Sequence, residues 1–159
     1  MSHYVLERRQ VVPGDLETVF GFFQDPTNLE TITPPWLHFE IQSSTDERVR
    51  VGTEIAYRLR WQIFPMTWRS RISEYEDGRL FADEMLKGPY KRWYHRHLFN
   101  SVPDGVEVTD IVVYELPFGP LGRLVHRIAV RTQLEAIFEH RREAIARIFG
   151  SVERPGVPS

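Results

Sequence analysis

Two histidines separated by a single residue are the side chains of this sequence whose types and spacing most directly suggest chemistry. His95 and His97 lie in an alternating stretch that predicts a β-strand, and residues two apart on a strand point to the same side. Trp93 and Phe99 share that side, so one face combines two aromatic rings with two imidazoles. Such a face suits the wall of an organic pocket, a metal site or a hydrated core.

Two carboxylates are expected on the same inward face as the histidines. Asp83 and Asp110 lie in the strands that precede and follow the histidine strand. A buried carboxylate is costly unless it is paired, so we expect His95, His97 or a helix arginine such as Arg131 to be a partner. A His/Asp pair in a dry pocket can exchange protons with a ligand, which makes these two aspartates and two histidines the candidate catalytic residues.

The same four side chains have two other interpretations. They can hydrogen-bond only one another and water, as most buried polar networks do. They can also hold a metal, because His95, His97 and one aspartate form a possible facial triad. The histidine spacing alone is a weak metal motif, and we expect neither a metal nor another cofactor. Elemental analysis of the purified protein tests this expectation.

The elements that must position these residues follow from the periodicity of the apolar side chains. A first strand is predicted over Tyr4–Val12, followed by two short helices, one after an N-cap at Asp15 and one from Pro26 to about Ile32. Alternation then predicts strands over residues 36–41, 52–61, 66–75, 79–87, 91–102 and 106–116. Helical spacing returns at the end and predicts one long helix, Leu121–Phe149.

Two Asp-Gly pairs predict hairpin turns and therefore strand register. A two-residue turn at Asp77-Gly78 places Ile72 opposite Asp83 and Ser70 opposite Met85. The second pair is Asp104-Gly105. A two-residue turn there gives three pairings, which are His95 with Tyr114, His97 with Val112, and Phe99 with Asp110.

A curved antiparallel sheet covered by one long helix is expected to leave a cavity, because a single helix cannot fill a wide concave face. We predict that a small hydrophobic or aromatic molecule binds there, between aromatic walls and Asp/His anchors. The predicted ligand-binding residues are Tyr57, Trp68, Asp83, Met85, Trp93, His95, His97, Phe99, Asp110, Tyr114 and Phe138.

Length and composition limit the functional classes. The chain of 159 residues favours one domain, 1–150, with 151–159 as a flexible tail. The net charge of −2 gives no global field for nucleic acid, and the arginines of the last helix are expected to form a solvated face balanced by glutamates. There is no cysteine, no signal peptide and no run of apolar residues long enough to span a membrane, so a cytoplasmic location is expected.

The order of elements resembles the helix-grip superfamily, which includes Bet v 1-like allergens, START lipid-transfer domains and polyketide cyclases. Within it, the chain resembles bacterial cyclase/dehydrase-like ligand-binding proteins over about residues 3–149. The matching segments are Pro34-Pro35-Trp36-Leu37-His38-Phe39, Gly52-Thr53, Trp68, Phe81-Ala82-Asp83-Glu84, Gly88-Pro89-Tyr90 with Trp93, His95, His97 and Phe99, and Asp110 with Val112, Tyr114 and Leu116-Pro117-Phe118-Gly119.

This resemblance implies an α+β fold of six or seven strands and a lipid-, polyketide- or isoprenoid-like ligand. Two alternatives stay open: a cyclase or dehydratase that uses a His/Asp pair for proton transfer, and a protein-interaction module with a vestigial pocket. Some relatives carry a fused epimerase-like domain, so an epimerase-like partner in trans is a further expectation. The residues 116–122 are either a mobile gate or a rigid strand-to-helix corner. The oligomeric state is not indicated.

Overall fold

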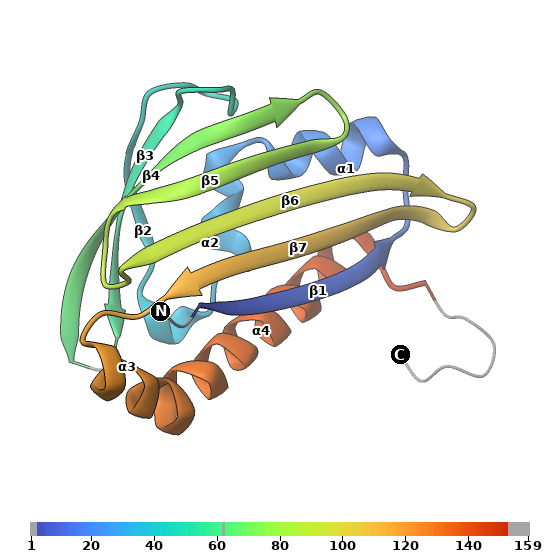
Figure 1. Ribbon diagram of the computed structural model, residues 1–159. Helices are drawn as coiled ribbons and strands as arrows, with labels where there is room; N and C mark the ends of the chain where they lie inside the picture. The colour runs from blue at the N-terminus through green and yellow to red at the C-terminus, as the bar shows by residue number, and fades with distance from the viewer. Residues whose placement is uncertain (1–2, 62, 153–159) are drawn as a thin grey trace.

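A seven-stranded antiparallel sheet forms most of the molecule in the computed structural model, which describes residues 3–61 and 63–152. The strands run in the order β1-β7-β6-β5-β4-β3-β2, so β2 to β7 form a meander whose last strand pairs with β1. Figure 1 shows the sheet curving around the C-terminal helix. The strands are β1 Tyr4–Val12, β2 Glu40–Ser44, β3 Glu54–Trp61, β4 Phe64–Glu76, β5 Leu80–Lys87, β6 Arg92–Val102 and β7 Gly105–Glu115.

The helices lie in two groups that together cover the concave face of the sheet (Figure 1). The first group follows β1 and consists of α1 Leu16–Phe23, η1 Pro26–Asn28, α2 Leu29–Ile32 and η2 Pro35–Leu37. Asp15 caps α1 by accepting a 2.7 Å hydrogen bond from the Thr18 backbone N–H, as predicted. The second group is the C-terminal helix, made of α3 Gly119–Val125, the π-helical turn η3 His126–Val130 and α4 Arg131–Phe149.

The predicted strand over residues 36–41 is wrong at its start. Pro35 begins the 3₁₀ turn η2 instead, since proline suits the first helical position, and β2 starts only at Glu40. His38 ends that turn with φ at 48°, in the left-handed region. The predicted C-terminal helix is confirmed, although it begins two residues earlier and contains a π turn.

The predicted register of β4 and β5 is confirmed, although the loop between them differs from the predicted one. Ile72 pairs with Asp83 and Ser70 pairs with Met85. The loop has three residues rather than two, because Glu76 pairs with Leu80. A bulge between Ile72 and Glu74 adds one residue to β4 and cancels the longer loop.

The predicted register of β6 and β7 is wrong by two residues. Val102 pairs with Gly105, so Pro103 and Asp104 occupy the turn instead of Asp104 and Gly105. Proline has the φ preferred at the first central position of a type I turn, and glycine is favoured at its last position. His95 consequently pairs with Val112, and His97 pairs with Asp110. A shift of two leaves every side chain on its predicted face, because strand side chains alternate with period two.

Substitution of Gly105 by alanine is expected to lower the free energy of unfolding by roughly 2–3 kcal/mol. Gly105 has φ at +147°, and a Cβ there would lie 2.1 Å from the carbonyl oxygen of Val12. Urea unfolding measures the change. Gly21→Ala is the matched control: Gly21 lies in α1 with open space around it, and alanine there should stabilise by about 0.5–1 kcal/mol. Equal effects at both positions would contradict the expectation.

The described part of the core consists of two apolar clusters. One joins α1 to β5, β6 and β7 through residues such as Phe20, Phe81 and Phe99. The other joins β7 to α4 through Val112, Leu134 and neighbouring side chains.

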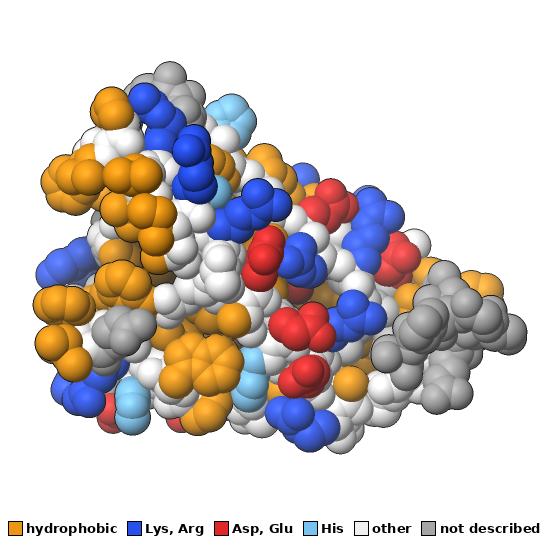
Figure 2. Space-filling view, turned by 90° about the horizontal axis from the view of Figure 1, so that it is seen from below, with side chains coloured by type: hydrophobic (Ala, Val, Ile, Leu, Met, Phe, Trp, Pro, Cys, Tyr) orange, Lys and Arg blue, Asp and Glu red, His pale blue; other side chains and the backbone are white. Residues whose placement is uncertain are grey.

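No helix among the described residues is long and apolar enough to cross a membrane. Figure 2 shows that hydrophobic side chains also gather on the outside, toward the left end of the molecule, where α3 lies.

Candidate functional site

A cavity of about 540 Å³ lies between the concave face of the sheet and the C-terminal helix. Its walls are mainly apolar and aromatic. Trp68 stacks on Tyr57 with ring centroids 5.9 Å apart and meets Trp93 edge-on at 5.3 Å. Across the cavity, the helix contributes Leu134, Phe138 and other apolar side chains. Sheet curvature and helix placement together create this space.

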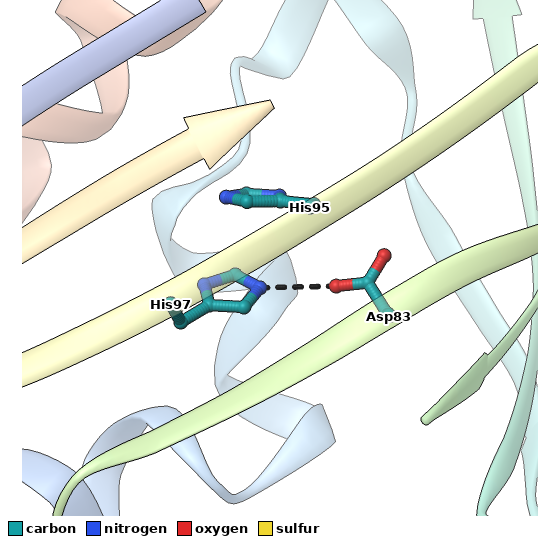
Figure 3. Close-up of side chains that lie close together, drawn as sticks. All are labelled: Asp83, His95 and His97. Atoms are coloured by element: carbon teal, nitrogen blue, oxygen red, sulfur yellow. Dashed lines mark hydrogen bonds and ion pairs between the residues drawn. The ribbon is translucent and has the colours of Figure 1, made fainter. Parts of the chain in front are cut away.

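The polar end of the cavity is lined by Asp83, His95 and His97, which form a cluster with Asp110 behind them. His97 Nε2 lies 3.0 Å from Asp83 Oδ2, and His95 Nε2 lies 2.9 Å from Asp110 Oδ1. His97 Nδ1 lies 3.2 Å from the same Asp110 oxygen. The two imidazole rings stack with centroids 3.8 Å apart. Figure 3 shows Asp83 and the two histidines projecting from adjacent strands toward one another.

Strand register explains why the four side chains meet. His97 pairs with Asp110 across β6 and β7, while His95 pairs with Asp83 across β5 and β6. Both histidines therefore stand between the two carboxylates on one face of the sheet. The hydrogen bond from each histidine goes to the diagonal aspartate, a distance that long side chains can span.

Arg141 on α4 completes the cluster, although the helix arginines were predicted to form a solvated face. Its Nη2 lies 3.6 Å from Asp110 Oδ1, and its side chain is 11% exposed, so it is not part of a solvated helix face. The histidines are partners of the aspartates as expected, but Arg131, the helix arginine suggested as another, pairs with Glu135 at 3.3 Å. The available signal was helical spacing, because Arg141 is three residues after the buried Phe138 and four before the buried Ile145.

The cluster shifts the pKa values of its two histidines in opposite directions. Burial alone would lower the pKa of His97, but the nearby carboxylates of Asp110 and Asp83 outweigh it and raise the pKa. Burial, together with the charge of His97, lowers the pKa of His95 despite its bond to Asp110. Burial would raise the pKa of Asp110, yet Arg141 and the histidines hold that pKa well below its ordinary value. These directions favour a neutral His95 beside a protonated His97, and in that state the cluster carries no net charge, because the two aspartates balance His97 and Arg141.

Stability is expected to fall steeply in acid because of Asp110. Its carboxyl has a lower pKa in the folded protein than the ordinary value of 3.8. Between these two pKa values the unfolded chain binds more protons, so the stabilisation present above pH 3.8 is lost as the pH falls through the folded pKa. Urea unfolding from pH 7 to pH 2 measures the slope. Asp110→Asn should flatten it, whereas Asp104→Asn, in an exposed turn, should not.

The donor atoms of Asp83, His95 and His97 lie within 4.8 Å of one another, a spacing that a metal ion could use. Several contacts oppose this use. Each Nε2 is already bonded to a different aspartate, the rings are stacked, and the guanidinium of Arg141 adds a nearby positive charge. The expectation that no metal binds stays a prediction.

The structure divides the predicted ligand-binding residues into two sets. Those that line the cavity are Tyr57, Trp68, Asp83, Trp93, His95, His97 and Phe138. Those outside the described lining are Met85, Phe99, Asp110 and Tyr114. Asp110 lies behind the histidines, and Phe99 packs against Phe20 in the core. Tyr114, whose pKa burial raises to about 12, bonds His126 at 2.7 Å.

The arrangement of strands, helices and cavity is the helix-grip fold, as the resemblance predicted. No family model matches the sequence, and no protein of curated function matches it. Among solved structures, the di-domain ARO/CYC StfQ from the steffimycin biosynthetic pathway has a TM-score of 0.69 at 14% identity, over 93% of this chain and 50% of that chain. Ara h 8.0201 has a TM-score of 0.61 at 13% identity, over 92% and 99% of the two chains. Ginseng major latex-like protein 151 from Panax ginseng has a TM-score of 0.57 at 16% identity, over 84% and 96%.

Proposed function

We propose that this chain binds a small hydrophobic or aromatic molecule, of lipid-, polyketide- or isoprenoid-like character, in the cavity between the sheet and the C-terminal helix. The observation that carries the proposal is the cavity itself. Its volume of about 540 Å³ falls within the roughly 300–1,000 Å³ typical of small-molecule sites. A vestigial pocket, the interaction-module alternative, would have no reason to keep so large an apolar space.

The polar cluster supports a ligand with one hydrogen-bonding end. Asp83 lines the cavity and its side chain is 18% exposed, so it can accept a hydrogen bond from a ligand hydroxyl. Arg141 also lines the cavity, and its buried Nε and Nη2 have no hydrogen-bond acceptor. A ligand carbonyl or hydroxyl oxygen would satisfy that donor set. The protonation state favoured for the cluster carries no net charge, so the proposed ligand is neutral at this end.

Native mass spectrometry of the protein purified from its host tests the proposal. We expect a retained molecule of a few hundred daltons, which is lost on denaturation. Titration with N-phenyl-1-naphthylamine, a neutral apolar fluorophore, should show saturable binding with a roughly micromolar Kd. A protein that carries no molecule and does not enhance the fluorescence of this probe would contradict the proposal.

One observation favours a second candidate, an enzyme of the cyclase or dehydratase type. His95 and His97 face the cavity with pKa values moved in opposite directions, which is how a site obtains a neutral base beside a protonated acid. Loss of water from a bound hydroxyketone, followed by mass spectrometry, would reveal turnover. A His95→Ala/His97→Ala variant that binds the fluorophore normally but loses turnover would support catalysis. Turnover retained in that variant would exclude these residues.

The epimerase-like partner remains a proposal from the resemblance, and no contact of the structure bears on it. Co-purification from the host, followed by mass spectrometry of the bound proteins, would test it.

The Leu116–Gly122 corner is tightly packed at one point, because a Cβ on Gly122 would lie 2.2 Å from the Pro117 carbonyl oxygen. The close approach of the Gly122 backbone to Pro117 supports a rigid corner rather than a mobile gate.

A further inference from the structure

Seven large apolar side chains are exposed at one end of the molecule. Five lie on the corner and the first turns of the C-terminal helix, and two lie at the tip of the β3–β4 hairpin. We call this set the apolar rim, which consists of Phe118, Leu121, Leu124, Val125, Ile128, Ile63 and Phe64. Ile63 is 81% exposed and Phe118 is 78% exposed. Apolar side chains grouped in this way commonly mark an interaction site.

The cavity opens at the apolar rim. Only four of its described lining residues are exposed, namely Pro89, Phe118, Leu121 and Val125. Trp61, beside the hairpin tip, donates a hydrogen bond to Gln133 on α4, which ties the tip to the helix on the other side of the opening. The rim therefore surrounds the entrance rather than an unrelated surface.

The two segments that carry the rim are basic and contain no acidic residue. Residues 55–69 and 116–130 together hold five arginines, and all 22 acidic residues of the chain lie elsewhere. The chain as a whole has a net charge of −2, so the positive charge is concentrated at the cavity entrance. In Figure 2 the blue side chains lie among or beside the orange ones at that end, while most red ones lie elsewhere on the face shown.

The backbone at Phe118 presents its ring to the solvent. Its φ is +71°, in the left-handed region that a bulky residue rarely adopts, and Gly119 follows with φ at +51°. Such a conformation is costly and is found chiefly where surrounding structure or function requires it. Here the strained residue is also one of the most exposed apolar side chains of the described chain.

We propose that the apolar rim docks on an anionic lipid bilayer. The rim side chains would enter the boundary between headgroups and acyl chains, and the surrounding arginines would contact the lipid phosphates. A second copy of the chain fits this face poorly, because face-to-face contact would bring like charges together. Nucleic acid would leave the apolar side chains unused. Docking places the cavity entrance against the lipid, so an apolar ligand can pass between bilayer and cavity without crossing water.

Co-sedimentation with vesicles tests the docking directly. The protein is expected to bind vesicles of 30% phosphatidylglycerol in phosphatidylcholine, and to bind pure phosphatidylcholine vesicles much more weakly. Ile63→Glu should weaken binding to the anionic vesicles at least about tenfold, since it removes an apolar group that docking would bury and adds a charge that the anionic lipid repels. Val51→Glu is the matched control: Val51 is 64% exposed at the opposite end of β3, and its variant should bind like wild type.

A charge-reversal pair tests the arginines. Arg123→Glu/Arg127→Glu should weaken binding about 30-fold or more, at about fivefold for each arginine near an anionic surface. Arg79→Glu/Arg147→Glu changes the net charge equally at exposed positions outside the two segments and should have little effect. Binding should also fall as salt is raised. Far-ultraviolet circular dichroism confirms that each variant is folded.

Several results would overturn the docking proposal. These are no binding to anionic vesicles, equal binding to neutral ones, or equal loss in the rim variants and their controls. Dimerisation or nucleic-acid binding through the rim, without vesicle binding, would also overturn it. The proposal is separable from ligand binding, because fluorophore titration in free solution requires no vesicle. A rim variant that fails on vesicles yet binds the fluorophore leaves the proposed function intact.

Discussion

Replacing Asp110 by alanine is expected to lower the free energy of unfolding by about 3–5 kcal/mol, the largest stability effect we predict at a single polar side chain. Asp110 accepts a hydrogen bond from His95 and lies 3.6 Å from the guanidinium of Arg141. Both the carboxylate and the guanidinium are about nine-tenths buried. Removing the carboxylate leaves the charge of Arg141 in the core without its partner, and that residual charge is the main cost.

Urea unfolding at pH 7 measures this change. Asp110→Asn keeps the shape of the side chain and removes its charge. If the charge dominates, this variant should lower the free energy of unfolding almost as much as Asp110→Ala does. Glu107→Ala, on the opposite face of the same strand, is the control and should change stability by no more than about 0.5 kcal/mol. A cost below about 1 kcal/mol for Asp110→Ala would mean that water or a bound ligand already compensates Arg141.

Replacing Leu59 by tryptophan is expected to weaken ligand binding about 100-fold while the fold persists. Leu59 lines the cavity from β3, in a strand position that accepts an aromatic residue readily. The indole would displace roughly ten ligand atoms, and at about 0.3 kcal/mol per atom the loss is about 3 kcal/mol of binding free energy. Titration with N-phenyl-1-naphthylamine gives the two dissociation constants.

Arg58→Trp provides the matched comparison for this cavity variant. Arg58 is the adjacent residue on β3, is exposed, and points to the opposite face, so the same indole added there stays outside the cavity. Its affinity for the fluorophore should stay within about threefold of wild type. If Leu59→Trp and Arg58→Trp bind equally well, the fluorophore does not occupy the cavity, and the proposed site is wrong.

Much of the fold could be predicted because alternation and helical spacing are local properties. The strand faces were correct for His95, His97, Asp83 and Asp110, although the turn before β7 was misplaced by one residue, which shifted the register by two. The register shift was an even number of residues, so each side chain stayed on its predicted face of the sheet. At Asp77-Gly78 the loop was one residue longer than predicted, and a bulge in β4 restored the predicted pairs. No local sequence pattern predicted that bulge.

Other features could not be read from the chain because they depend on how the helix crosses the sheet. The crossing brings Arg141 to Asp110 and leaves Arg131 with Glu135, and both arginines look alike in sequence. It also separates residues of one strand face, since Trp93 lines the cavity while Phe99 is packed in the core.

By itself, the sequence determined the order of the elements, the side of the sheet on which each side chain lies, and the presence of a His/Asp set on the concave face. These follow from the periods of strand and helix, which are set by backbone geometry. Only the tertiary structure decided which partners those side chains meet, how much space remains between helix and sheet, and which apolar residues stay uncovered at the entrance. These depend on sheet curvature and helix placement, which arise from the packing of the whole chain.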